Sequence, residues 1–203
     1  VKHITTGEGG AITTNNEIYA KRIKHFRNHG ITSDHQERAQ KGSWFYEMTD
    51  LGYNYRITDF QCALGISQLA KLPQWIQRRQ EIADMYKMAF INSDYIKPLE
   101  VSKDVSHAYH LYVVRIDFTK LRINRAKLFT QLKHKDIGVN VHYIPVHLHP
   151  FYTNKYKTKK GDCPIAELVY EEIISLPIYP AMADEDVRRV IGVVQDIITK
   201  NAK

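Results

Sequence analysis

The sequence predicts an α/β fold, because segments with strand-like alternation are interspersed with segments of helical spacing along one chain. The expected order is two strands and three helices, then strand, helix, strand and two further helices. Hydrophobic residues make up 43% of the 203 residues, and no long-period repeat interrupts the pattern. We expect a domain boundary in or soon after a long helix that ends near residue 91.

The first elements are predicted to be two short strands, HIT and AITT within residues 1–14, around a tight turn at residues 6–10. Adjacent glycines in this turn supply backbone angles that other residues resist. Two such strands resemble a sheet edge that needs the rest of its sheet. The chain therefore looks like the second half of a larger protein.

A helix is expected over residues 17–29, because Asn16 suits the N-cap and Gly30 suits the position after the last turn. The apolar residues at helical spacing would give this helix part of a buried face; they are Ile18, Ile23 and Phe26.

The middle of the chain is predicted to hold a loop and two helices. Residues 31–50 are polar and without a clear period, apart from the aromatic residues 44–46, so we expect a loop. One helix should run over residues 58–72, and a second should run from Pro73 to Phe90. Proline is tolerated in the first turn of a helix, which favours two helices over one.

The remaining elements alternate between strand and helix. Strands are expected at residues 107–117 and 138–144, with a helix over residues 124–135 between them. Two more helices are expected at residues 164–174 and 184–199. The last helix should pack on one face through residues at helical spacing, namely Val187, Val190, Ile191, Val194 and Ile198.

Composition limits the class of protein. The formal charge of +7 and the isoelectric point near 9.3 favour anionic partners such as nucleic acid, phosphate cofactors or nucleotide-linked substrates. No membrane span is expected, because no stretch approaches the roughly 18–20 uninterrupted apolar residues that a span needs. Cys62 and Cys163 show no disulfide or metal spacing, which is typical of a reduced, cytoplasmic protein.

Four motifs occur in a fixed order along the chain: KHITTGEGGAITTN, LGYNYRITDFQCALGISQL, VNVHYIPVH and ISLPIYPAMADEDV. Together they resemble the C-terminal half of the DegT-type nucleotide-sugar aminotransferases, over essentially the whole chain. These enzymes depend on pyridoxal 5'-phosphate (PLP) and have the aspartate-aminotransferase fold, fold type I. The subfamily that it resembles most makes UDP-4-amino-4,6-dideoxy-N-acetyl-β-L-altrosamine in pseudaminic acid synthesis.

The resemblance implies a domain organisation, a reaction and partners. Residues 1–91 would be the end of the large PLP-binding domain with its connecting helix, and residues 92–203 the small C-terminal α/β domain. Glutamate would donate its amino group to the 4-keto carbon of a UDP-linked 6-deoxy sugar. The enzyme would be a homodimer with shared active sites, with no nucleic acid or membrane partner. A different nucleotide or keto position is the alternative within the family.

The family's N-terminal half would hold most of the phosphate cup, the ring that stacks on the cofactor and the aspartate that pairs with its pyridine nitrogen. We therefore expect this chain to work with such a half, as part of one polypeptide or as a second chain. Alone it should bind PLP poorly and be inactive.

By position in the first motif, Lys2 is the lysine that in the family holds the cofactor as a Schiff base. A transaminase needs an amine that acts as covalent ligand, leaving group and proton carrier, and lysine can do all three. Burial beside a cofactor would lower its pKa from about 10.4. Related sugar dehydratases carry histidine there, and some use an iron–sulfur centre that two isolated cysteines cannot build. Without the motif, Lys2 would be an ordinary surface lysine.

The GYNYR segment at residues 52–56 contains the second candidate group. Asn54 resembles the family's asparagine that reaches across the dimer interface to the cofactor phosphate. Its amide can donate to a phosphate oxygen without adding a buried charge. Arg56 would assist the same phosphate or pair with Asp59, while Thr58 would cap the following helix.

The third candidate group lies in VHYIPVHLHPFY, residues 141–152. In the family the corresponding loop lies beside the substrate cleft, so His142, Tyr143 and His147 could hydrogen-bond the sugar or the diphosphate. A histidine- and tyrosine-rich domain interface is the alternative. A metal site is not expected, because no cysteine or acidic residue completes a recognisable ligand spacing.

A nucleic-acid-binding module is the competing hypothesis from another class. Tyr152 and Tyr156 lie among lysines 155, 157, 159 and 160, and such a patch could follow a phosphate backbone. However, the other charges are dispersed and no nucleic-acid motif is present, so we interpret KYKTKK as a solvated loop.

Overall fold

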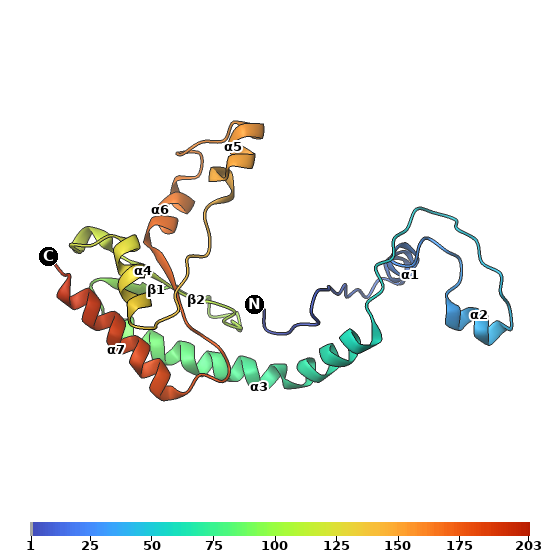
Figure 1. Ribbon diagram of the computed structural model, residues 1–203, viewed down its shortest axis with the longest axis horizontal. Helices are drawn as coiled ribbons and strands as arrows, with labels where there is room; N and C mark the ends of the chain where they lie inside the picture. Colours follow the sequence, from blue (N-terminus) through green and yellow to red (C-terminus); the bar gives the residue numbers. More distant parts are fainter. Residues whose placement is uncertain (1) are drawn as a thin grey trace. The chain divides into compact units, whose positions relative to one another are not determined.

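The computed structural model describes residues 2–203, which form two compact units. The first unit ends at Lys71 and the second runs from Leu72 to Lys203, so the division falls inside a long helix (Figure 1). The domain boundary at residue 91 concerns the domains of a longer enzyme and stays a prediction. Among the described residues, no helix is long and apolar enough to cross a bilayer.

The described part of the first unit contains helices and loops but no strand. Its helices are α1 (Glu17–Phe26), α2 (His35–Lys41) and the first part of α3 (Asp59–Phe90). The predicted strands HIT and AITT are wrong. A strand exists only with a hydrogen-bonded neighbour, and no described segment offers its backbone to residues 3–5 or 11–14.

Helix α1 begins as predicted and ends earlier. The side chain of Asn16 accepts hydrogen bonds from the amides of Ile18 and Tyr19 at 2.9 and 3.2 Å, which confirms the N-cap. The helix ends at Phe26, whose carbonyl accepts from the amide of Tyr53 at 2.8 Å. None of its residues is buried, so the predicted buried face is wrong for the chain by itself.

Helix α2 lies in the segment predicted to be a loop. Asp34 accepts from the amide of Glu37, and the Glu37 side chain accepts from the amide of Asp34, which makes a capping box. Gly42 ends the helix in the left-handed region at φ 59°. The Asp-x-x-Glu spacing is readable in the sequence and could have revealed this helix.

Helix α3 is one continuous helix of 32 residues, so the prediction of two helices that meet at Pro73 is wrong. Proline at 73 has no N–H to donate to the carbonyl of Leu69, and the helix continues with one backbone hydrogen bond fewer. Residues Ile82, Ala83, Tyr86 and Phe90 of its second half are buried in the second unit.

The second unit is built on an antiparallel sheet of three strands in the order β1-β2-β3. β1 (Ile96–Pro98) pairs with β2 (Tyr112–Ile116), and β2 pairs with β3 (Ile173–Leu176). The strand expected at residues 107–117 is confirmed in its second half, whereas β1 was not predicted.

Two predictions near β3 are wrong. Residues 138–144 form no strand, and their only pairing among the described residues is a bridge between Asn140 and Ser175. The helix predicted over residues 164–174 ends at Glu172, because Ile173 and Ile174 leave it to pair with β2. Tertiary pairing overrides the local helical spacing there.

Helices α4 and α7 cover the sheet, and α5 and α6 follow the loop after residue 144 (Figure 1). Leu128 and Leu132 of α4 are buried, and the α7 face is buried as predicted through Val187, Val190, Val194 and Ile198. In chain order the helices are η1 (Phe118–Lys120), α4 (Arg125–His134), η2 (Val146–Leu148), α5 (Pro150–Tyr156), α6 (Pro164–Glu172) and α7 (Asp184–Lys200).

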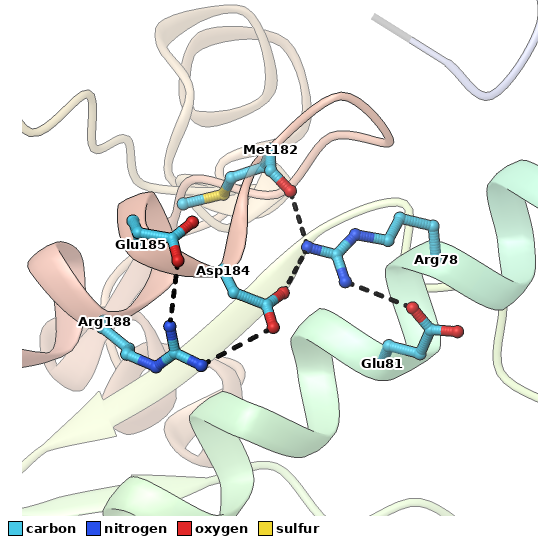
Figure 2. A network of polar contacts seen from close by, with 6 residues as sticks. All are labelled: Arg78, Glu81, Met182, Asp184, Glu185 and Arg188. Carbon is cyan, nitrogen blue, oxygen red and sulfur yellow. Dashed lines mark hydrogen bonds and ion pairs between the residues drawn. The ribbon is translucent and has the colours of Figure 1, made fainter.

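A charged network joins α3 to the start of α7. Figure 2 shows Arg78 donating to the carbonyl of Met182 and to the carboxylate of Asp184, both at 2.7 Å. The bond to Asp184 raises the pKa of Arg78. Arg188 reaches Asp184 from the other side at 3.7 Å. The network therefore fixes the direction in which the chain enters α7.

Candidate active site

The glycine-rich loop after Lys2 is held against α3 by two glutamine side chains. Gln68 accepts from the amide of Thr5 at 2.9 Å, and Gln61 donates to the carbonyl of Glu8 at 3.0 Å. Within the loop, the hydroxyl of Thr5 accepts from the amide of Gly7 at 3.1 Å. The amide of Gly7 in the turn is thus satisfied by the side chain of Thr5.

Small residues let this loop approach the helix closely. Gly7 lies at φ 83°, in the left-handed region that favours glycine. A Cβ on Gly9 would come within 2.8 Å of the Thr6 hydroxyl, and one on Gly65 of α3 within 3.0 Å of the Thr6 methyl group. The loop conformation therefore depends on glycine in both elements.

Lys2 lies at the start of this loop, three residues before Thr5. Its side chain is exposed and makes no hydrogen bond or ion pair within residues 2–203. A primary amine in this state is accessible to a carbonyl compound, which is the first requirement for a covalent cofactor ligand.

Asn54 and Arg56 are brought together as a polar cluster with Asn28. Arg56 donates through Nε to Oδ1 of Asn54 at 3.2 Å and through Nη1 to Oδ1 of Asn28 at 3.1 Å. Asn28 is buried, and its backbone bridges that of Asn54. Arg56 therefore bonds to two amides, and it forms no ion pair with Asp59 within the described residues.

This arrangement leaves the cluster suited to an anion. Because Oδ1 of Asn54 accepts from Arg56, the amide nitrogen of Asn54 is the group left to donate elsewhere. The hydrogen-bond partners of the Arg56 guanidinium are neutral amides, so no carboxylate among them offsets its positive charge. A phosphate is the kind of ligand that one amide donor and one guanidinium bind well.

The cluster and the loop line one open hollow of the first unit, with a volume of about 1560 Å³. Three arginines, Arg22, Arg27 and Arg56, line it together with two acidic residues, Glu8 and Asp50. Its volume exceeds the roughly 300–1,000 Å³ of a typical small-molecule site. Asn54, Arg56 and the glycine-rich loop thus surround a space with an excess of positive charge.

Thr58 does not cap α3 in the predicted way. Its hydroxyl donates to Oε1 of Gln61 at 2.8 Å, and its amide donates to the same oxygen at 3.2 Å. Gln61 therefore holds both the start of α3 and the loop carbonyl of Glu8, which makes it a link between the helix and the loop.

His142 and Tyr143 line a second hollow, of about 650 Å³, in the second unit. Nδ1 of His142 lies 2.8 Å from the hydroxyl of Ser175 in β3, which fixes the ring. Tyr143 lies edge-on to that ring and is 66% exposed. The opposite wall belongs to α6 and its first turn, and its residues include Cys163, Pro164, Ile165, Val169 and Tyr170.

His147 is not among the residues that line this hollow. Its Nε2 donates to Oε1 of Glu167 at 2.8 Å, and both side chains are nearly buried. This hydrogen bond lowers the pKa of Glu167, and the amides of Gly161 and Cys163 lower it further. Within residues 2–203, no group of three histidine, cysteine or acidic residues is placed to hold a metal ion.

The structure reveals three polar residues that sequence reasoning missed: Asn28, Glu167 and Ser175. Asn28 becomes significant only because residues 27–31 pair with residues 48–55, a contact that no local pattern predicts. Ser175 lies in β3, a strand that was not predicted and whose first two residues were assigned to the preceding helix. Glu167 gave one signal, since it is an acidic residue in the first turn of a helix that follows Pro164.

Comparisons with known proteins give a consistent result. A model of the DegT/DnrJ/EryC1/StrS aminotransferase family matches residues 1–195. An uncharacterized protein, MJ1066, from Methanocaldococcus jannaschii is 48% identical over 98% of this chain and 52% of its own length. The UDP-4-amino-4,6-dideoxy-N-acetyl-beta-L-altrosamine transaminase of Campylobacter jejuni is 35% identical over 100% of the chain and 51% of its own.

Among solved structures, Helicobacter pylori PseC, an aminotransferase involved in the biosynthesis of pseudoaminic acid, matches with a TM-score of 0.86 and 29% identity. The match covers 98% of this chain and 51% of that one. It confirms the predicted aspartate-aminotransferase type of fold. The chain spans about half the length of the curated relatives that it matches.

Proposed function

The chain belongs to the DegT/DnrJ/EryC1/StrS aminotransferase family, and we propose that it is the C-terminal half of a nucleotide-sugar aminotransferase. In the proposed reaction glutamate gives its amino group to the 4-keto carbon of a UDP-linked 6-deoxy sugar, as in pseudaminic acid synthesis. The names of the Campylobacter jejuni and Helicobacter pylori relatives support this substrate class. Residues 1–91 would belong to the large domain and residues 92–203 would form the small one.

Aminotransferases of this family use PLP. The donors of the first unit suit this group: Lys2 offers a primary amine to the cofactor of its own subunit, and Asn54 and Arg56 offer an amide and a cation to the phosphate of the partner subunit's cofactor. When bound, PLP supplies an electron sink for the electrons of the substrate's C–H bond.

The residues of the chain have separate roles in the proposal. The amine of Lys2 would anchor the cofactor. When it is free, its Nζ would pass a proton from the α-carbon of glutamate to the cofactor in the first half-reaction, and from the cofactor to the sugar carbon in the second. Asn54 donates its amide hydrogen to the phosphate. Arg56 keeps the Asn54 amide in that orientation through the bond at 3.2 Å and adds positive charge.

In the second unit, His142 and Tyr143 are proposed to contact the sugar or its diphosphate, because both line the same hollow. His147 would act on the substrate only indirectly, since its Nε2 is engaged by Glu167. The proposal includes a homodimer in which Asn54 serves the cofactor of the partner subunit. We place the reaction in the cytoplasm, where free cysteines such as Cys62 and Cys163 persist.

One observation carries the proposal: a model of this aminotransferase family matches residues 1–195, the range that contains Lys2, the glycine-rich loop and the Asn54–Arg56 pair. The test uses the full-length enzyme that contains this chain. Borohydride reduction of the PLP-loaded enzyme should attach the cofactor to the peptide that carries Lys2, as read by mass spectrometry. Lys2→Ala should lose amino transfer by at least about a thousandfold.

The control is Lys21→Ala, which removes an exposed lysine of α1 and should leave the rate unchanged. UDP-linked and dTDP-linked 4-keto sugars are compared with glutamate as donor, to separate nucleotide preference from the reaction itself. Cofactor attachment at another lysine, or undiminished transfer by Lys2→Ala, would contradict the proposal.

A further inference from the structure

Glu167 is a nearly buried carboxylate that the proposed chemistry does not use. It lies in the first turn of α6 and its side chain is 11% exposed. Oε1 accepts from Nε2 of His147 at 2.8 Å and from the amide of Gly161 at 2.8 Å. Oε2 accepts from the same Gly161 amide at 3.0 Å, and the amide of Cys163 lies 3.3 Å from Oε1.

These bonds join three separate pieces of chain. Glu167 belongs to α6, His147 to η2, and Gly161 and Cys163 to the turn before α6. A further bond, from the hydroxyl of Thr158 to the carbonyl of His147 at 2.7 Å, ties the start of that turn to η2. A single carboxylate therefore fixes the separation of η2 from the first turn of α6.

That separation also bears on the hollow beside His142 and Tyr143, because η2 and the first turn of α6 follow directly on, or include, residues that line it. One wall ends at Pro145, two residues before His147, and the other begins at Cys163, whose amide faces Glu167. The Glu167–His147 pair lies behind both walls without lining the hollow itself. A carboxylate with charge-assisted bonds to both sides holds such a spacing more firmly than apolar contact does, because the bonds are directional.

We infer that Glu167 is a positioning residue for the nucleotide-sugar substrate: through His147 and the turn at residues 161–163 it sets the shape of the hollow in which the sugar binds. The inference rests on the proposed function and deepens it. Glutamate is not predicted to use this hollow. Loss of Glu167 should therefore impair the half-reaction with the sugar and spare the half-reaction with glutamate.

The first experiment compares Glu167→Gln with the wild-type full-length enzyme in the two half-reactions. The sugar KM should rise about tenfold, the order expected when one charge-assisted hydrogen bond is lost. The rate of the half-reaction with glutamate should stay within about twofold. Glu100→Gln, which changes an exposed carboxylate outside the hollow, is the matched control and should change neither quantity.

The second experiment does not need catalysis. Cys163 is exposed and lines the hollow, so bound sugar nucleotide should slow its alkylation by iodoacetamide, as measured by peptide mass spectrometry. This protection should be present in the wild type and largely lost in Glu167→Gln. Hydrogen exchange of the segment at residues 158–163 should be faster in the variant, because the amides of Gly161 and Cys163 exchange a charged acceptor for a weaker neutral one.

His147→Asn is the second variant, for the case in which Glu167→Gln folds poorly. It removes one bond and leaves the amides of Gly161 and Cys163 on the carboxylate. A smaller rise in sugar KM, with unchanged exchange at residues 161–163, is expected. If both variants lose thermal stability while the sugar KM and the protection of Cys163 stay at wild-type values, Glu167 is only structural and the inference is overturned.

The two proposals fail in different ways. Protection of Cys163 by a UDP-linked sugar without any amino transfer would refute the proposed function and support the hollow as a sugar site. Amino transfer without protection of Cys163 would support the proposed function and overturn the inference.

Discussion

At the scale of single residues, the polar groups of this chain act through orientation. Arg56 orients the side-chain amide of Asn54 by donating a hydrogen bond to its oxygen. Ser175 fixes the His142 ring, and Glu167 fixes His147. In each case a polar neighbour, exposed in the case of Arg56 and buried in the cases of Ser175 and Glu167, decides which atom of the functional side chain is left to meet a ligand.

Glu167 also makes stability depend on pH in a defined direction. Its pKa is lowered in the folded state by His147 and the backbone amides, so the ionised form is favoured by folding. The stabilisation is complete above the ordinary glutamate value of about 4.3 and is lost as the pH falls through the lower folded-state pKa.

We therefore expect the wild type to withstand more urea than Glu167→Gln at about pH 7, and the gap between their midpoints to close as the pH falls below about 4. Urea titrations of both proteins across this range measure the gap, with Glu100→Gln as the control that stays near the wild type throughout. A gap that widens in acid would show that the folded state does not favour the carboxylate.

The sequence could identify candidate site residues only where they lie in a recognisable motif. Lys2, Asn54 and Arg56 lie in two of the four motifs, and the structure brings Asn54 and Arg56 into direct contact. Asn28 and Glu167 could not be indicated in the same way, because their partners lie 28 and 20 residues away along the chain. Long-range hydrogen bonds leave no local pattern.

At the scale of elements, caps were predicted better than ends. Asn16 accepts backbone amides as the predicted N-cap, and Asn124, which was predicted only as the start of a helix, also accepts an amide as an N-cap. The ends of α1 and α6 depend on other segments. The amides of Tyr53 and Tyr55 bond to the carbonyls of Phe26 and Arg27 at the end of α1, and Ile173 pairs with β2 at the end of α6. Several strand predictions were wrong for the same reason, because a strand needs a hydrogen-bonded partner that the local sequence does not identify.

Pro73 in α3 offers a test at this scale. The residue is exposed in the interior of a continuous helix, where proline is roughly 3 kcal/mol less favourable than alanine. Pro73→Ala restores an N–H that can bond to the carbonyl of Leu69, and we expect the free energy of unfolding to rise by about 1–3 kcal/mol. Urea unfolding of the full-length enzyme measures it.

Gln74→Ala, at the neighbouring exposed position, is the control for Pro73→Ala and should change the free energy by less than about 0.5 kcal/mol. Destabilisation by Pro73→Ala would show that the proline is needed for a bend in α3 and that the helix is not regular across it.

At the scale of the whole molecule, the two units differ in how completely they bury their apolar residues. The second unit has one core that joins α3, α4, α7 and the sheet. All the core residues come from this unit, whereas Trp44, Phe60, Ile66 and other large apolar side chains of the first unit are exposed. The α/β class was predictable from the alternation of helices and strands. The unequal burial was not, because the hydrophobic content of a segment does not show which other segment packs against it.

The exposed apolar side chains of the first unit fit the proposed homodimer, in which each active site takes Lys2 from one subunit and Asn54 from the other. Lys2→Ala and Asn54→Ala homodimers should each be nearly inactive. In a hybrid of the two variants, one site would carry both defects and the other would be intact. Equal co-expression should therefore restore about a quarter of the wild-type activity, since about half of the dimers are hybrids with one working site.

Differently tagged subunits allow the hybrids to be isolated before the glutamate-dependent transfer is measured. Lys2→Ala co-expressed with the double variant is the control, because neither combination rebuilds a complete site, and it should stay inactive. Isolated hybrids that show no recovery would mean that Asn54 acts within its own subunit. Recovery requires a donor from across the interface, because no rearrangement within one subunit returns both the amine and the amide to a single site.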